Sequence, residues 1–114
     1  SENSAKFIKN GAVELYYDDA LKLKTLSNGV NISGTLDMNG TVHPYPSNTY
    51  DLGTSSYRWR NIYVNDMHFA NSPENTNSVD GTWGDWTLQE GDENIFMINN
   101  RTGKKYKMGL QEVN

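Results

Sequence analysis

The sequence predicts an all-β protein, and three observations support this prediction. Hydrophobic and polar residues alternate in several short runs, of which 13–17 is the clearest, and a period of two indicates strands with one buried face. Asn-Gly pairs at 10–11, 28–29 and 39–40 separate these runs and favour turns, because both residue types tolerate positive φ. Hydrophobic residues make up only 35% of the chain, yet it contains seven Tyr and three Trp. This composition suits thin β layers better than a thick core.

The N-terminal part, up to about Val42, is predicted to consist of short strands. The alternating runs are 5–8, 13–17, 21–24, 30–33 and 35–38. A helix over 18–26 is also possible on composition, but Leu21 and Leu23 would then face different sides of it. We therefore favour a strand there.

A linker and a corner are predicted to follow. Residues 43–47, His-Pro-Tyr-Pro-Ser, should be extended, because two prolines so close together forbid a helix. The run 50–64 then has a break at Gly53, hydroxyl residues that suit the cap of a helical turn over 57–60, and a strand over 62–64. The run contains no obvious nucleophile or metal ligand, which indicates a structural and binding role rather than catalysis.

The C-terminal part is predicted to form a β meander after a polar loop. Residues 71–81 contain almost no apolar side chain and are the best candidate for a mobile insertion. From Asp85 onward the alternation returns, with turns at 91–93 and 99–103, and predicts three antiparallel strands. The central strand, 95–98, is apolar on both faces. One of those faces needs a cover, which we expect a neighbouring subunit to provide.

The overall composition excludes several classes of protein. A net charge of -4 argues against non-specific binding of nucleic acid, which needs a basic face. No apolar stretch approaches the length of a membrane span, so we expect no membrane insertion. The chain has no Cys, which excludes disulfides, thiolate catalysis and Cys-based zinc sites. It opens at Ser1 and soon enters a strand-like pattern, so we expect a fragment of a longer protein.

Several segments resemble the virion fibres of tailed bacteriophages. Residues 9–18, Lys-Asn-Gly-Ala-Val-Glu-Leu-Tyr-Tyr-Asp, continuing to 29–36, look like the shaft repeats of tail fibres. Tyr-Asp-Leu-Gly at 50–53, followed by Tyr-Arg-Trp-Arg-Asn-Ile-Tyr at 57–63, is similar to a signature near the distal end of such fibres. Two further stretches, 84–91 and 98–106, look like a C-terminal cap of related fibres.

This resemblance implies an elongated, intertwined homotrimeric β fibre, with strands from all three chains wrapped around one axis. It implies a surface fibre of the virion that is assembled in the bacterial cytoplasm and attaches to a glycan or protein receptor on the host. The rest of the fibre would lie on the N-terminal side. The expected parts are 1–47 as β shaft and linker, 48–82 as corner element and polar loop, and 83–114 as antiparallel β cap. An autocleaved chaperone domain often follows the distal signature in such fibres, but the sequence contains none after it.

We expect no enzymatic activity and no cofactor. Acidic pairs occur at 18–19, at Asp80 with Asp85, and at 92–93, and glycoside hydrolysis uses two carboxylates across a sugar site. These acids lie in polar turns, however, where solvated carboxylates are expected. A glycan-depolymerising tailspike fragment and a purely structural fibre or head decoration remain the alternatives.

The two histidines, His43 and His68, are isolated in the sequence. In a trimer, three copies of one histidine around the axis would be able to hold a metal. A packed or exposed histidine is the more common situation for a side chain without neighbouring ligands. We therefore expect no metal site.

Two sets of residues are expected to act in binding and in assembly. Trp83 lies next to the polar loop and is as well suited to a surface as to a core. Trp86 is better suited to a core. Trp59 is flanked by arginines, which suit cation–π packing. The expected receptor contacts are Trp83, Asn75, Asn77, Asp80, Arg101 and Lys104. The expected trimer core is Val13, Leu15, Tyr17, Leu21, Leu23, Ile32, Trp59, Ile62, Ile95, Met97 and Leu110.

The placement of Trp59 in a trimer core leads to a first testable prediction. Trp59→Ala should loosen the trimer, because truncation of a buried Trp costs about 3 to 5 kcal/mol. Thermal melting of the trimer measures this loss. An unchanged melting temperature would count against the placement of Trp59 in the core.

Overall fold

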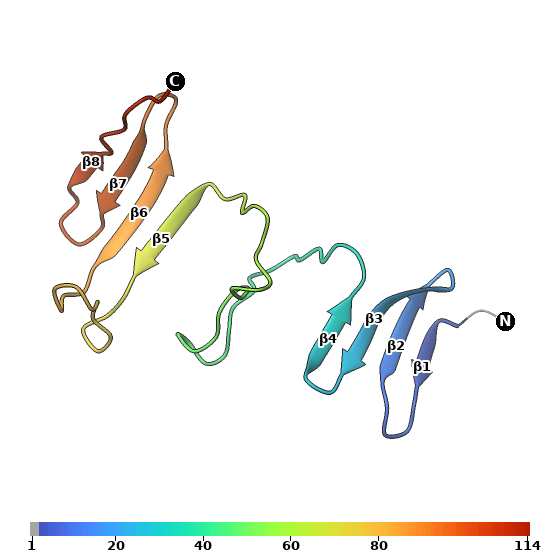
Figure 1. Ribbon diagram of the computed structural model, residues 1–114. Helices are drawn as coiled ribbons and strands as arrows, with labels where there is room; N and C mark the ends of the chain where they lie inside the picture. The colour runs from blue at the N-terminus through green and yellow to red at the C-terminus, as the bar shows by residue number, and fades with distance from the viewer. Residues whose placement is uncertain (1–2) are drawn as a thin grey trace. The chain divides into compact units, whose positions relative to one another are not determined.

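The computed structural model describes residues 3–114, which form eight β-strands and no helix. The strands make two four-stranded antiparallel sheets, each in the order of the chain (Figure 1). The chain divides after Leu52 into two units with one sheet each. The first sheet contains β1 (Ala5–Phe7), β2 (Val13–Tyr17), β3 (Ala20–Leu26) and β4 (Gly29–Ile32). The second contains β5 (Asp66–Ala70), β6 (Asp85–Glu90), β7 (Ile95–Asn99) and β8 (Lys105–Lys107). The predicted all-β class is confirmed.

The first sheet has one apolar face. The register aligns Ala5, Leu15, Leu23 and Ile32 in one row across all four strands. Directly opposed residues share a face of a sheet, so this row forms a continuous apolar stripe. Phe7 pairs with Val13 beside it. The alternation of the sequence therefore predicted the strands and the face correctly.

The other face of the first sheet is polar. Lys6, Glu14, Lys24 and Asn31 form its central row. The Nζ of Lys24 lies 3.9 Å from Oε2 of Glu14, and the hydroxyl of Tyr16 donates a hydrogen bond of 3.1 Å to Oε1 of Glu14. This face is thus suited to water, in contrast to the opposite one.

A two-residue turn joins β2 to β3 and rules out the alternative helix over 18–26. Asp18 and Asp19 have φ values of 47° and 66°, and Tyr17 pairs with Ala20 on either side of them. Two consecutive positive φ values in a two-residue loop are typical of a type I′ hairpin turn. Asp tolerates this conformation better than most residues. An Asp-Asp pair is a weaker turn signal than Asn-Gly, so this turn was not predicted.

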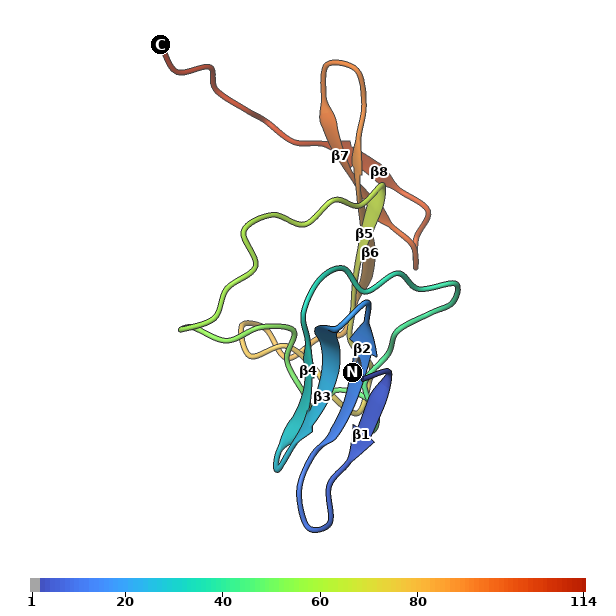
Figure 2. The ribbon, with the colours of Figure 1, turned by 90° about the vertical axis from the view of Figure 1, so that its right-hand side faces the viewer.

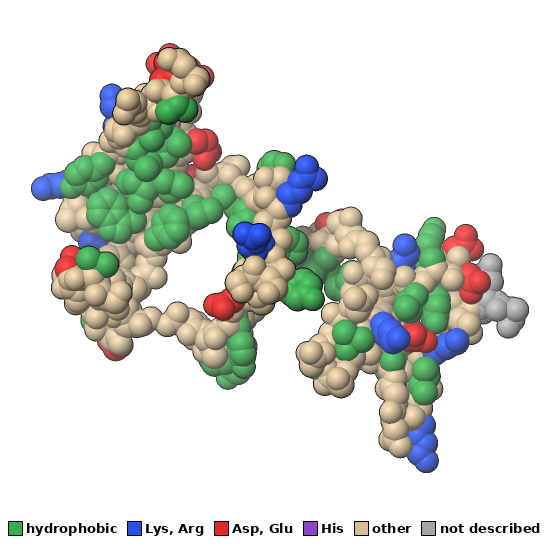
Figure 3. Space-filling model, in the orientation of Figure 1, with side chains coloured by type: hydrophobic (Ala, Val, Ile, Leu, Met, Phe, Trp, Pro, Cys, Tyr) green, Lys and Arg blue, Asp and Glu red, His purple; other side chains and the backbone are tan. Residues whose placement is uncertain are grey.

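One face of the second sheet is largely apolar, and the other carries Phe96 and Ile98 among polar residues, so β7 is apolar on both faces as predicted. On the largely apolar face the register aligns Met67, Leu88, Met97 and Tyr106 across all four strands, and Phe69 opposes Trp86 on the same face. Figure 3 shows hydrophobic side chains gathered over this sheet. We call the set Met67, Phe69, Trp86, Leu88, Ile95, Met97 and Tyr106 the apolar face of the second sheet.

The opposite face of the second sheet carries a small polar network around Thr87. The Thr87 Oγ1 lies 3.0 Å from Nδ1 of His68 and accepts a hydrogen bond of 2.9 Å from Nδ2 of Asn100. Thr87 is a polar residue, yet only 4% of its surface is exposed. Hydrogen bonding makes this burial tolerable.

Neither sheet has a second layer within its own unit, as the nearly edge-on view of the second sheet in Figure 2 shows. No hydrophobic side chain among residues 3–114 is buried. The chain exposes 10739 Å², whereas a folded monomer of this mass is expected to expose about 6,300 Å². The chain alone therefore has no hydrophobic core, and the predicted trimer core residues are partly or largely exposed in it.

Four predicted elements were wrong in place or length. Residues 35–38 and 62–64 form no strand and 57–60 no helical turn. The alternation of Tyr106, Met108 and Leu110, followed by Val113, predicts a last strand over this run, but that strand ends at Lys107. Strand β5 (Asp66–Ala70) was not predicted. Asp66, Met67, His68 and Phe69 alternate as a strand should, but the run is short and has only two large hydrophobic side chains.

Local conformation explains two of these differences. Gly34 has a φ of 125°, which turns the chain away from β4, and a strand over 35–38 has no partner strand in its unit. At 54–57, the N–H of Thr54 donates to the Tyr57 carbonyl at 3.0 Å and the Tyr57 N–H donates to Thr54 Oγ1 at 2.9 Å. These two bonds close a non-helical turn. Gly53, with a φ of 85°, provides the predicted break.

The hairpin at 18–19 leads to a second testable prediction. Asp19→Val should destabilise the first sheet by about 1 to 2 kcal/mol, because a β-branched residue is strained at positive φ. Asp37→Val is the control, since Asp37 lies in an irregular segment and is exposed. Thermal unfolding of both variants tests this. Equal melting temperatures would contradict the type I′ turn.

Candidate binding site

A groove of about 1000 Å³ lies at the end of the second sheet. The loop between β5 and β6 forms part of it, and the turn between β7 and β8 forms another part. Its lining is His68, Phe69, Ala70, Asn71, Asn77, Asp80, Thr82, Trp83, Gly84, Trp86, Asn99, Arg101 and Thr102. All of these residues belong to the second unit.

The polar loop 71–81 is held by its own side chains. The Asn77 Oδ1 accepts hydrogen bonds from the N–H groups of Val79 and Asp80, at 2.8 and 3.0 Å. The Asn77 Nδ2 donates to Asp80 Oδ1 at 2.8 Å and to the Thr82 carbonyl at 2.9 Å. Such Asx turns replace the missing strand hydrogen bonds. The segment predicted as an insertion is therefore a loop with a defined internal structure.

Asp80 has one oxygen engaged in the loop and one that is free. Its Oδ1 accepts hydrogen bonds from Asn77 Nδ2, from Thr82 Oγ1 at 2.8 Å and from the Thr82 N–H at 3.1 Å. The Asn77 hydrogen bond, followed by those from Thr82, lowers the pKa of Asp80 below its ordinary value. Its Oδ2 accepts no hydrogen bond from residues 3–114. The groove thus presents an ionised oxygen acceptor.

Trp83 and Arg101 form a stacked pair at the groove. The guanidinium carbon of Arg101 lies 3.7 Å from the centre of the Trp83 ring, and Nη1 donates a hydrogen bond of 2.9 Å to the Trp83 carbonyl. Asn99 Oδ1 accepts from the Arg101 N–H at 3.0 Å. A guanidinium over an indole face is a favourable cation–π arrangement. It fixes the ring in one orientation.

The cation–π contact occurs at Trp83 rather than at Trp59, where the sequence predicted it. Among the described residues the cation–π contacts are those of Lys6 with Tyr16 and Arg101 with Trp83. Trp59 instead lies beside Gly53, where an added Cβ would be 3.4 Å from the indole Cδ1. Residues adjacent in a chain point in different directions, so the flanking arginines did not reach the Trp59 ring.

Four of the six predicted receptor contacts come together in the groove. Asn77, Asp80, Trp83 and Arg101 line it. Asn75 lies in the same loop but bridges to Ser72, and Lys104 lies in the turn before β8; both are outside the lining. Sequence reasoning missed His68, Asn71, Thr82 and Asn99. Their place depends on strand pairing across the β5–β6 and β7–β8 connections, which no local pattern indicates.

The predicted acidic pairs do not meet across a sugar site. Asp18 and Asp19 occupy the turn between β2 and β3, and Asp92 and Glu93 the turn between β6 and β7. Asp85 accepts a hydrogen bond of 3.0 Å from Asn100. Among residues 3–114, no three His, Asp or Glu side chains gather as a metal site.

No family model, no curated protein and no solved structure matches the chain. No helix of the described residues is long and apolar enough to span a membrane.

The loop chemistry leads to a third testable prediction, on the titration of Asp80. Asn77→Ala should raise the pKa of Asp80 toward its ordinary value of 3.8, because Asn77 contributes the largest stabilisation of the carboxylate. A carbon-detected NMR titration of the carboxyl group measures the shift.

The sign of the accompanying pH effect follows from the lowered pKa. The ionised form of Asp80 is favoured by the fold, so its contribution to loop stability is present above the ordinary pKa and is lost as pH falls through the lowered one. The control is Asn75→Ala, a change in the same loop that removes no hydrogen bond to Asp80. If both variants titrate like the wild type, Asn77 does not set the pKa.

Proposed function

We propose that this chain is a segment of a non-enzymatic, homotrimeric β fibre of a tailed bacteriophage virion, and that the fibre attaches to the surface of the bacterial host. The observation that carries the proposal is the apolar face that each sheet leaves uncovered by its own unit. A single sheet is not stable in water with an apolar face exposed, because a sheet must bury that face against another layer. Other copies of the chain supply this layer in the proposed trimer.

The area to be covered agrees with an obligate assembly. The exposed area of 10739 Å² exceeds the expected area of a folded monomer by about 4,400 Å². A standard interface buries only about 800 Å² on each partner, whereas obligate interfaces bury 2,000 to 5,000 Å² or more in total. An excess of this size supports contacts with more than one neighbour.

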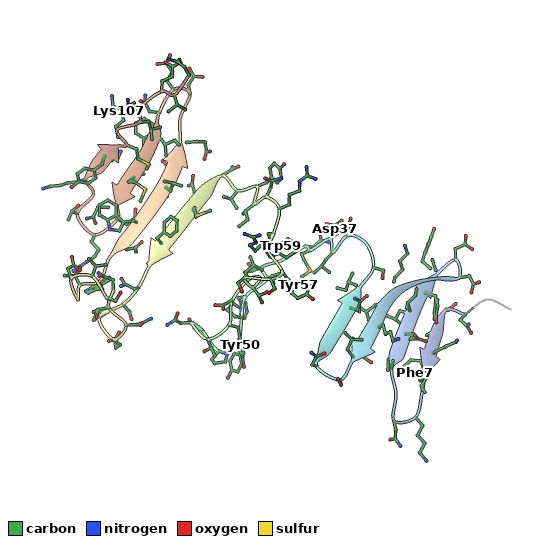
Figure 4. All side chains as sticks on the ribbon, in the orientation of Figure 1. Phe7, Asp37, Tyr50, Tyr57, Trp59 and Lys107 are labelled. Carbon is green, nitrogen blue, oxygen red and sulfur yellow. The ribbon has the colours of Figure 1, made fainter. Side chains whose placement is uncertain are left out.

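The irregular segment between β4 and β5 supports intertwining. Figure 4 shows the side chains of Tyr50, Tyr57 and Trp59 along it. Tyr50 is 68% exposed, Tyr57 82% and Trp59 64%. Strand pairing within the chain leaves this segment free, and in the proposed trimer other chains would cover its aromatic side chains. The number three comes from the resemblance of 50–53 and 57–63 to the distal signature of phage fibres.

The groove supports binding rather than catalysis. A glycosidase needs one carboxylic acid with a raised pKa beside a second carboxylate. Asp80, the acid that lines the groove, has its pKa lowered. The groove therefore favours attachment over the depolymerising alternative.

The fourth testable prediction concerns the mass of the protein in solution. Light scattering behind a sizing column should give about three times 12.9 kDa. Met97→Lys, on the apolar face of the second sheet, should dissociate the trimer, since burial of an unpaired charge costs several kcal/mol.

Gln89→Lys is the matched control for Met97→Lys. It adds the same charge on the opposite face, where Gln89 pairs with Phe96 and donates a hydrogen bond to Asp66 at 3.1 Å, and it should leave the trimer intact. Met97→Leu should also remain trimeric. A folded wild-type monomer would overturn the proposal. If both lysine variants dissociate equally, the apolar face is not the surface through which the subunits contact each other.

A further inference from the structure

We infer that the groove at the end of the second sheet binds a neutral pyranose sugar of a host surface glycan. This inference deepens the attachment role proposed above and rests on it. It commits that role to one place in the chain and to one class of ligand. Three properties of the groove carry it: its free polar atoms, its fixed aromatic ring and its balance of charge.

The groove presents both kinds of hydrogen-bonding atom that a sugar needs. Asp80 Oδ2 is a free acceptor among the described residues, because the hydrogen bonds that this carboxylate accepts from them all go to Oδ1. Arg101 uses only Nη1, and Asn99 only Oδ1, in side-chain bonds within residues 3–114. The Nε and Nη2 of Arg101 and the Nδ2 of Asn99 are therefore available donors. A sugar hydroxyl donates one hydrogen bond and accepts others, so neighbouring hydroxyls match an acceptor beside donors.

Trp83 provides an apolar surface among these polar atoms. Its ring lines the groove, and the Arg101 guanidinium at 3.7 Å covers one of its faces and fixes its orientation. The C–H groups of a pyranose form an apolar side that packs on aromatic rings, while its hydroxyls point to the polar rim. A fixed ring loses little conformational entropy when it binds, which favours a preformed sugar site.

The charges of the groove favour a neutral sugar over an anionic one. Asp80 and Arg101 both line the groove and offset each other, and the free Oδ2 of Asp80 would repel a carboxylate or a phosphate. The cluster of Lys104, Lys105 and Lys107 lies outside the lining. Anionic polysaccharide would be attracted to those lysines rather than to the groove, and salt would weaken that attraction.

The experiment is an NMR titration of the full chain in its assembled state, read at the indole N–H signals of the tryptophans. The probes are maltohexaose, mannohexaose and chitohexaose as neutral glycans and oligogalacturonate as the anionic one, each up to about 50 mM in sugar units. At least one neutral probe should shift the Trp83 signal in a saturable manner. Read at the indole N–H of Trp86, which also lines the groove, Trp83→Ala should then weaken the binding about tenfold or more, whereas Trp83→Phe should keep most of it.

Asp80→Asn is the sharper variant. The Asn side chain keeps an oxygen for the hydrogen bonds that Oδ1 now accepts from Asn77 and Thr82, and it replaces the free acceptor Oδ2 with a donor. The loop should remain folded while affinity for the neutral probe falls about tenfold. Asp92→Asn is the matched control, because it removes the same charge from the turn between β6 and β7, outside the groove, and affinity should not change.

Each remaining outcome contradicts the inference. No shift with any probe overturns it, and so does binding of oligogalacturonate alone with a strong dependence on salt. Equal effects of Asp80→Asn and Asp92→Asn would place the sugar elsewhere. The mass in solution is measured without a ligand, so the two proposals can fail separately. A trimer that binds no sugar would contradict the sugar site but not the fibre, whereas a monomer would contradict the fibre.

Discussion

The rest of this structure depends on one constraint: a β-sheet with an apolar face must be covered by a second layer. In the second sheet the row Met67, Leu88, Met97 and Tyr106 crosses all four strands, and in the first sheet the row from Ala5 to Ile32 does the same. The units divide after Leu52, and each contains a single sheet. The sequence therefore encodes strands and their faces within one chain, and in the proposed trimer the core is completed between chains.

Turn chemistry fixes which residues reach those faces. A shift of one residue in register would exchange the apolar and polar sides of a strand. The Asp18–Asp19 turn sets β2 against β3, and the turn closed by the Gly91 N–H and the Asn94 carbonyl, at 2.7 Å, sets β6 against β7. The longer β5–β6 connection uses Asn77 for the same purpose. Its side chain closes the loop and also positions Asp80 and Thr82, so loop stability and the shape of the groove have the same cause.

Much of the fold was predictable from the sequence, because alternation and turn residues are local signals. The strands around Leu15, Leu23 and Ile32 followed from a period of two, and the central position of 95–98 followed from its apolar residues on both faces. Residues 62–64 were assigned to a strand because Ile, Tyr and Val favour one, yet β5 forms at Asp66–Ala70, where the partner strand β6 is available. The strand propensity of a segment does not tell whether a partner strand lies beside it. The pairing of Trp83 with Arg101 was hidden for the same reason, since the two are brought together only by the register of β6 and β7.

The proposed subunit contact and the proposed sugar site adjoin each other at one end of the second sheet. Phe69 and Trp86 belong to its apolar face and also line the groove, so in the proposed trimer a neighbouring chain on that face lies next to the groove. Each trimer then carries three equivalent grooves on one rigid assembly. Linked sites of this kind raise the overall avidity for a repetitive surface far above the affinity of one site. If the proposed sugar site is weak, it would suffice for attachment only in the assembled chain, and the uncovered sheet face on which the proposed assembly rests would then also make the site effective.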